Sequence, residues 1–84
     1  MSYYTYILQS ELTGRHYIGQ TNNLEKRLYR HNKGYNLATR NRGPWEIIYS
    51  REFETRRDAV RLEKKLKGFK NPDKIDEWIK RQVG

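Results

Sequence analysis

The stretch "HYIGQTNNLEKRLYRHN", residues 16–32, decides the fold, because a strand pattern passes directly into a helix pattern there. Its first residues are typical of a strand that stops at Gly19, since an isolated glycine often marks a strand end or a close approach to the backbone. Asn22 is expected to cap the following helix, with Glu25 three residues later as in a capping box. We predict this helix over residues 23–33.

The predicted helix has two neighbouring strips of different character. Leu24 and Leu28 lie one turn apart and are expected to face the core. Arg27 and His31 share the same spacing on the adjoining strip, and Tyr17 precedes them on the strand. The stretch therefore brings a phenol, a guanidinium and an imidazole close together in sequence.

A hairpin is predicted on the N-terminal side of this helix. Residues 3–9, "YYTYILQ", and residues 15–20, "RHYIGQ", both read as strands, and Gly14 supplies the freedom for the turn between them. In an antiparallel hairpin of this length Tyr6 and Tyr17 come near each other across the ladder. The two tyrosines are thus expected to share one part of the sheet.

The C-terminal half continues with a loop, a strand and two helices. Residues 34–44 show no period and are interpreted as a surface loop. Residues 45–53 predict a third strand, with Trp45, Ile47 and Tyr49 on one face.

Both C-terminal helices carry start signals. Thr55 is expected to cap the first of them, with Asp58 three residues later, and Gly68 to end it. Asn71 is expected to cap the last helix, over residues 72–82. The stripes that these helices would bury comprise Ala59, Leu62 and Leu66 on the first and Ile75, Trp78 and Ile79 on the second.

These elements predict an α/β fold of the α+β type, in which helices flank a three-stranded antiparallel sheet. The order is strand-strand-helix-strand-helix-helix. The length of 84 residues suits a single domain over residues 1–84, and a hydrophobic content of 35% implies a thin core.

The amino-acid composition favours some classes of partner and excludes some kinds of site. The net charge of +8 favours a polyanionic partner, of which nucleic acid is the commonest. The chain has no cysteine, which excludes disulfides and thiolate zinc sites and fits a reducing cytoplasm. Neither a membrane-spanning run nor a secretory signal is recognisable, so we expect a cytoplasmic protein without a membrane partner.

In five features the sequence resembles the GIY-YIG nuclease superfamily, in particular its small single-domain bacterial members. These members are similar to the N-terminal domain of the excision-repair endonuclease. The second half-motif is intact, and the first keeps only its tyrosine. An arginine ten residues after the motif tyrosine, a histidine one turn later and a glutamate on the helix after the third strand also match. The matching residues are Tyr17-Ile18-Gly19, Tyr4-Thr5-Tyr6, Arg27, His31 and Glu63.

The resemblance implies a metal-dependent endonuclease that hydrolyses phosphodiester bonds in DNA, with RNA as the alternative substrate. Tyr17 is implied as the residue that accepts the proton of the attacking water, and Tyr6 as the group that positions this water or contacts the phosphate. Arg27 would bind the phosphate and His31 would assist as a second base or orient the water. Glu63 would hold one Mg²⁺ or Mn²⁺ ion.

Further residues are expected to contact the nucleic acid backbone. Gly19 would leave room for the phosphate, and basic or polar side chains would add affinity without reading sequence. The other candidates for substrate binding are Arg40, Arg42, Lys64, Lys67 and Asn71.

Two departures from the family pattern leave an alternative open. Gln20 stands where many repair-type members carry a lysine, and the first half-motif is altered. A non-catalytic nucleic-acid binding module of the same fold is therefore a second hypothesis, and a protein-interaction domain with incidental charge is a third. Because family members usually owe their target choice to an attached domain, which we do not expect here, sequence-specific cleavage is not expected, and structure-directed or repair-linked cleavage stays open.

Overall fold

The computed structural model describes residues 2–83, and of Val83 the backbone alone. Three antiparallel strands form one sheet in the order β2-β1-β3, so β2 is an edge strand. The element order β-β-α-β-α-α confirms the prediction. The elements are β1 (Tyr3–Ser10), β2 (His16–Thr21), α1 (Leu24–Asn32), β3 (Trp45–Phe53), α2 (Arg56–Lys67) and α3 (Pro72–Val83).

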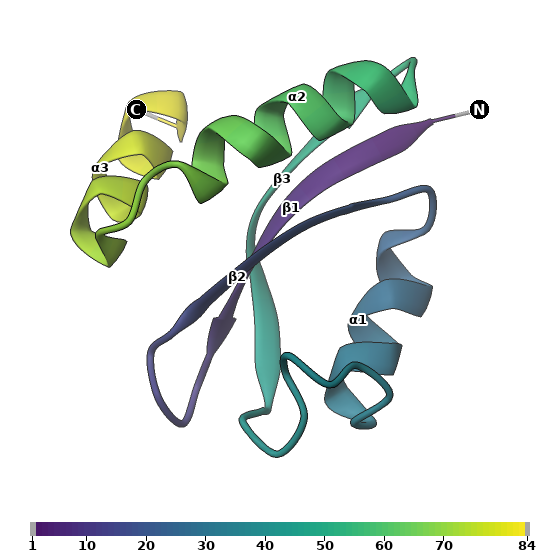
Figure 1. Cartoon of the computed structure of the whole chain (residues 1–84), viewed down its shortest axis with the longest axis vertical. Helices are drawn as coiled ribbons and strands as arrows, with labels where there is room; N and C mark the ends of the chain where they lie inside the picture. The colour runs from purple at the N-terminus through teal and green to yellow at the C-terminus, as the bar shows by residue number, and fades with distance from the viewer. Residues whose placement is uncertain (1, 84) are drawn as a thin grey trace.

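Helices cover both faces of the sheet. α1 lies on one face, and α2 and α3 lie on the other (Figure 1). Each interface has its own apolar cluster, because alternate residues of β1 point to opposite faces. The cluster on the α1 side contains Tyr6, Leu8 and Trp45, with Tyr17, Leu24, Leu28 and Ile47 packed against it. The cluster on the α2 and α3 side contains Ile7, Ile18, Leu62, Leu66, Ile75 and Trp78.

The helix ends follow the signals in the sequence at three places. Thr55 caps α2, where its side chain accepts a hydrogen bond from the backbone N–H of Asp58. Asn71 caps α3 through the N–H of Asp73 at 2.9 Å. Gly34 follows α1 with a φ of +79°, a left-handed conformation that glycine adopts without strain.

The predicted cap of α1 was wrong by one residue. Asn23, and not Asn22, is the N-cap, and its side chain accepts from the N–H of Lys26. The reason lies in β2, which extends through the buried Thr21, whereas the prediction ended it at residue 20. The hydroxyl of Thr21 accepts from the N–H of Asn23, so the helix cannot begin earlier.

The alternation predicted for β3 was also wrong for Tyr49. Trp45 and Ile47 pack on the α1 side, but Tyr49 packs on the other side, where its ring meets Trp78 edge-on with centroids 5.0 Å apart. The register between β1 and β3 shifts between Ile7 and Leu8. An irregularity of this kind reverses the facing of every later residue on the strand.

Within residues 2–83, no helix combines the length and the apolar character that crossing a membrane requires.

Candidate active site

The candidate site lies at β2, the edge of the sheet, and its two tyrosines share one face. In the register of β1 and β2, Tyr6 pairs with Gly19 and Leu8 pairs with Tyr17. Tyr6 and Tyr17 are therefore diagonal neighbours, as the hairpin predicted, and both pack in the cluster on the α1 side.

Gly19 lets the Tyr6 ring lie flat over the backbone of β2. A side-chain carbon built at Gly19 would stand 2.5 Å from the phenolic oxygen and 2.7 Å from Cζ of Tyr6. No residue with a Cβ fits there unless the ring moves. We predicted that the space beside Gly19 would admit the phosphate. On this face of the sheet, however, the phenol of Tyr6 occupies that space.

A hydrogen-bonded chain holds Tyr6 in this position. The Tyr6 hydroxyl lies 3.1 Å from Nε2 of His31, and Nδ1 of His31 lies 2.8 Å from Oγ1 of Thr39. Thr39 in turn donates toward the carbonyl of Asn36 at 3.5 Å. This direction assigns the imidazole proton to Nδ1, so Nε2 accepts from the Tyr6 hydroxyl.

Burial sets the protonation of this chain. Tyr6 and His31 are each 2% exposed. Burial raises the pKa of the Tyr6 phenol above its ordinary value; the phenol of Tyr17 adds to the rise, the guanidinium of Arg27 opposes it and the carboxylate of Glu63 adds to it. Burial, together with the charge of Arg27, lowers the pKa of His31 to about 4. At neutral pH the phenol is protonated and the imidazole is neutral, which agrees with the hydrogen-bond directions.

Tyr17 completes the aromatic group and is more accessible than Tyr6. Its ring centroid lies 4.7 Å from that of His31, at an interplanar angle of 59°. Its side chain is half-buried, whereas that of Tyr6 is enclosed. Of the two phenols, Tyr17 is therefore the one that a bound substrate or its attacking water reaches more readily.

Arg27 brings positive charge to the same group from α1. It lines a polar hollow of about 120 Å³ at the start of the helix, together with Lys26 and Arg30. The charge of Arg27 acts on both Tyr6 and His31, as their pKa shifts show. The structure thus places Tyr6, Tyr17, Arg27 and His31 on one side of the sheet, as the sequence pattern required.

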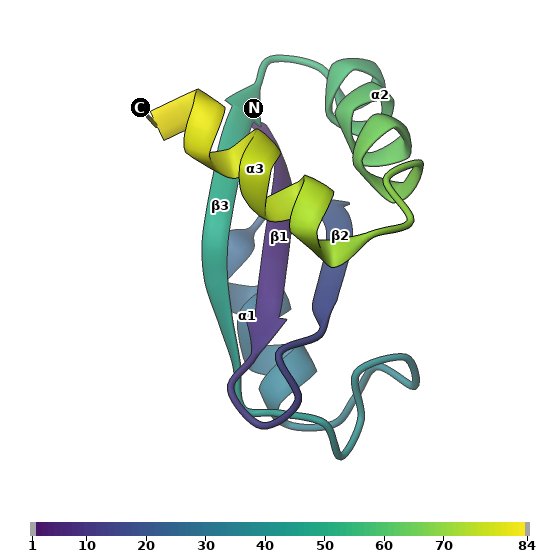
Figure 2. The ribbon, with the colours of Figure 1, turned by 90° about the vertical axis from the view of Figure 1, so that its left-hand side faces the viewer.

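Glu63 approaches from the other layer. It lies on α2, which packs against β1 and β2 on the face opposite α1 (Figure 2). Its side chain is 18% exposed and forms an ion pair with Nζ of Lys67 at 2.9 Å. The carboxylate nevertheless raises the pKa of the Tyr6 phenol. Because α2 and the tyrosines lie on opposite faces of the sheet, one ligand would have to pass the edge strand β2 to contact both.

The donor set fits a magnesium-type ion better than a zinc-type ion. Among the residues that the structure describes, no group of three or more histidine, cysteine, aspartate or glutamate side chains could hold a metal. Mg²⁺ keeps several waters and is often held by one or two carboxylates together with a substrate phosphate. Glu63 alone satisfies that requirement once Lys67, whose side chain is 55% exposed, releases it.

The remaining predicted contacts are dispersed over the surface. Arg40 and Arg42 are exposed in the loop that follows α1. Lys67 lies beside Glu63, but Lys64 lines a separate basic hollow on α2, shared with Arg56, Arg57 and Arg61. The structure therefore does not gather these cations into one patch.

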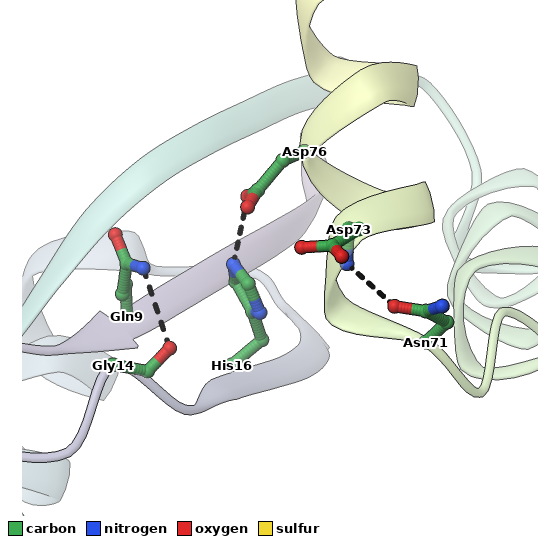
Figure 3. A network of polar contacts seen from close by, with 6 residues as sticks. All are labelled: Gln9, Gly14, His16, Asn71, Asp73 and Asp76. Atoms are coloured by element: carbon green, nitrogen blue, oxygen red, sulfur yellow. Dashed lines mark hydrogen bonds and ion pairs between the residues drawn. The ribbon is translucent and has the colours of Figure 1, made fainter.

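Asn71 has a structural partner, which Figure 3 shows. Its side-chain oxygen accepts the N–H of Asp73 at the start of α3. Gln20 faces the α2 side, opposite Thr5, and its Oε1 is buried with no hydrogen-bond partner in the part of the chain described. The position expected to carry a lysine thus adjoins the Glu63 layer and not the phenol of Tyr17.

Two polar contacts were not predicted from the sequence. Thr39, which is 1% exposed, lies in an aperiodic loop, so no spacing rule could have connected it with His31. His16 on β2 contacts Asp76 on α3 through Nε2 and Oδ1 at 3.1 Å (Figure 3). The only signal for this second pair was a histidine on the same strand face as Ile18.

Comparison with known proteins agrees with this geometry. The GIY-YIG catalytic domain matches residues 2–76 of the chain. The UPF0213 protein of Clostridium perfringens is 40% identical over 73 residues, which cover 86% of this chain and 77% of that protein. The UPF0213 protein of Oceanobacillus iheyensis is 36% identical over 74 residues, covering 87% and 85%.

A solved structure extends the similarity to three dimensions. The solution NMR structure of the UPF0213 protein of Bacillus halodurans aligns with a TM-score of 0.62 and 28% identity, over 100% of this chain and 88% of that one. Because the domain match spans most of the sequence and the relatives align along it, the protein belongs to the GIY-YIG family.

Proposed function

We propose that this protein is a divalent-metal-dependent endonuclease that hydrolyses phosphodiester bonds in DNA. Membership of the GIY-YIG family implies nuclease chemistry on nucleic acid in general, typically with a divalent metal. The observation that carries the finer proposal is the contact between Tyr6, Tyr17 and His31 at a sheet edge that Arg27 makes positive. The net charge of +8 supports a polyanionic substrate.

Arg27 would bind the scissile phosphate. Its guanidinium presents a planar fork of donors that matches two phosphoryl oxygens and stays charged at every relevant pH. In the transition state the same contact would offset the charge that develops on these oxygens. The buried imidazole of His31, being neutral, would not compete for the phosphate.

The two phenols would have different roles. Tyr17, which is half-buried, would accept the proton of the attacking water, and it would do so in its phenolate form. Tyr6 keeps its proton because burial raises its pKa, and it donates this proton to His31, so it would orient this water as a fixed acceptor. His31 would hold Tyr6 in place through Nε2.

Glu63 would hold one Mg²⁺ or Mn²⁺ ion at the β2 edge. When bound, such an ion supplies Lewis-acid stabilisation of the leaving oxygen. Lys67 would have to leave the carboxylate first, which costs little because its own side chain is 55% exposed.

Incubation of the purified protein with DNA, followed by measurement of DNA cleavage, tests the proposal. We expect nicking of supercoiled plasmid, flap or single-stranded DNA with Mg²⁺ or Mn²⁺. Glu63→Gln and Tyr17→Phe should each lower the rate by about 100-fold or more, because each removes one transition-state contact of about 3 kcal/mol. Arg57→Gln on the outer side of α2 is the matched control and should cut at the parental rate. Parental rates in both test variants would disprove the assignment.

A non-catalytic nucleic-acid binding module is the second candidate. The pairing of Glu63 with Lys67 and the neutral Gln20 favour it, because both weaken the catalytic half of the site. Tight, salt-sensitive binding without metal-dependent cleavage of any of these substrates would support this candidate. Weak binding to every nucleic acid at low salt would instead favour the protein-interaction hypothesis.

A further inference from the structure

An open surface cavity of about 420 Å³ lies on the other side of Tyr17, between the edge of β2 and the junction of α2 and α3. It is distinct from the tyrosine and imidazole cluster, but Tyr17 and Lys67 both line it. Its volume lies in the range of small-ligand sites, which is roughly 300–1,000 Å³. The cavity therefore adjoins both halves of the candidate active site.

The walls of this cavity combine two kinds of chemistry. Arg15 and Lys70, both exposed, contribute positive charge in addition to Lys67. Ile18, Phe69, Pro72 and Ile75 contribute apolar surface. Cations beside an aromatic and aliphatic wall suit a ligand with an anionic end and a flat, weakly polar end.

A buried polar atom also belongs to this wall. The side chain of His16, which lines the cavity, is 5% exposed. Its Nε2 is engaged by Asp76, whereas its Nδ1 is buried and has no hydrogen-bond partner among the described residues. Figure 3 shows the pair, in which His16 of β2 reaches toward Asp76 of α3. Because Nε2 donates to the carboxylate, Nδ1 of a neutral His16 is an acceptor.

We propose that this cavity binds one unpaired nucleotide of the substrate strand, next to the phosphate that is cut. Its phosphate would contact Arg15 and Lys70, and its base would lie against Phe69. A base that is paired and stacked within a duplex is not free to lie against Phe69, so the substrate would be single-stranded, flapped or mismatched at this position. The inference rests on the proposed function for the placement of the cut, but not for binding itself.

Nucleotide binding without metal tests this subsite separately from cleavage. We would titrate isotope-labelled protein with deoxyadenosine 5′-monophosphate in the presence of a chelator and follow NMR shifts. Saturable shifts are expected at His16, Ile18 and Phe69. Deoxyribose 5′-phosphate, which lacks the base, should bind about fivefold more weakly or worse, because it cannot use the apolar wall.

Charge variants locate the site. Arg15→Gln combined with Lys70→Gln should weaken binding about tenfold. Arg57→Gln combined with Arg61→Gln removes the same charge from the outer side of α2 and should leave the affinity within about twofold of the parent. The subsite would be disproved by equal binding of the sugar phosphate, by parental affinity in the first double variant, or by shifts confined to the hollow around Arg27.

Failure of this titration would leave the cleavage assay intact, and an inactive protein that binds the nucleotide as expected would leave the subsite intact. The two proposals can therefore fail independently.

Discussion

The two layers on either side of the sheet contribute to the candidate site in different ways. On the α1 side, Tyr6, His31 and Thr39 are almost fully buried and joined by hydrogen bonds. On the α2 side, Glu63 is 18% exposed, and among the described residues its ion pair is with Lys67, whose side chain is 55% exposed. The α1 side is thus pre-organised by packing, whereas the α2 side can exchange its partner for a ligand.

Because of this difference, variants of the two groups should have different effects on the stability of the fold. Disturbing a buried hydrogen-bonded chain leaves polar atoms without partners, at a cost of about 1–3 kcal/mol for each. Disturbing an exposed ion pair costs about 0.2–1 kcal/mol. Variants of the Tyr6–His31–Thr39 chain should therefore affect folding, and variants of the Glu63–Lys67 pair should affect it much less.

The largest expected effect is the loss of stability in acid through His31. Its pKa is about 4 in the folded protein and 6.5 ordinarily, so between these values the unfolded chain binds a proton that the native protein does not. The free energy of unfolding should thus fall as the pH drops from about 6.5 toward about 4, by up to about 3 kcal/mol.

Urea unfolding of the parent and His31→Gln at several pH values measures this effect. The difference between the two proteins isolates His31 from the carboxylates that titrate in the same range. An NMR titration of the imidazole provides a second check that needs no variant. A His31 that gains its proton near pH 6.5 would show that the α1 side is open to water.

A smaller effect is expected from Gly19→Ala. The new methyl group would overlap the Tyr6 phenol, which is held by His31 and cannot swing away freely. Overpacking of this kind costs about 1–3 kcal/mol. The imidazole resonances of His31 should shift as well, because the contact with Tyr6 is lost. Gly14→Ala is strained by the φ of +75° at this turn, but its methyl group meets no atom within 4 Å, so it should leave the His31 resonances unchanged. Equal shifts in both variants would contradict the steric explanation.

The smallest effect is expected from Lys67→Gln. Removing the cation breaks the pair with Glu63, but both groups remain within reach of water, so the free energy of unfolding should change by less than about 1 kcal/mol. Thermal unfolding of this variant beside His31→Gln compares the two layers directly. A loss of several kcal/mol would mean that Glu63 is held as firmly as the α1 side.

Most of the fold was predictable because its signals are local. The hairpin, the cap at Thr55 and the stripe of Ala59, Leu62 and Leu66 each depend on residues within one or two turns of one another. The errors arose where a distant strand decides the outcome. Tyr49 changes face because of an irregularity opposite β1, and Asn23 caps α1 because Thr21 is bound into the sheet.

The site was predictable in its members but not in its arrangement. Spacing could place Arg27 and His31 on one strip of a helix. No spacing rule connects Thr39 with His31, since the link runs through an aperiodic loop. Nor could the sequence indicate that Glu63 would come from the layer opposite the tyrosines, because that depends on which face of the sheet α2 covers.

The approach of Glu63 to the tyrosines around β2 can be measured with Mn²⁺, whose unpaired electrons broaden NMR signals of nearby nuclei. We predict that the ring signals of Tyr6 and Tyr17 broaden together with those of residue 63, and that Glu63→Gln abolishes all three effects while the fold is kept. Broadening confined to α2, or broadening of the tyrosines that persists in Glu63→Gln, would contradict a single site shared by the two layers.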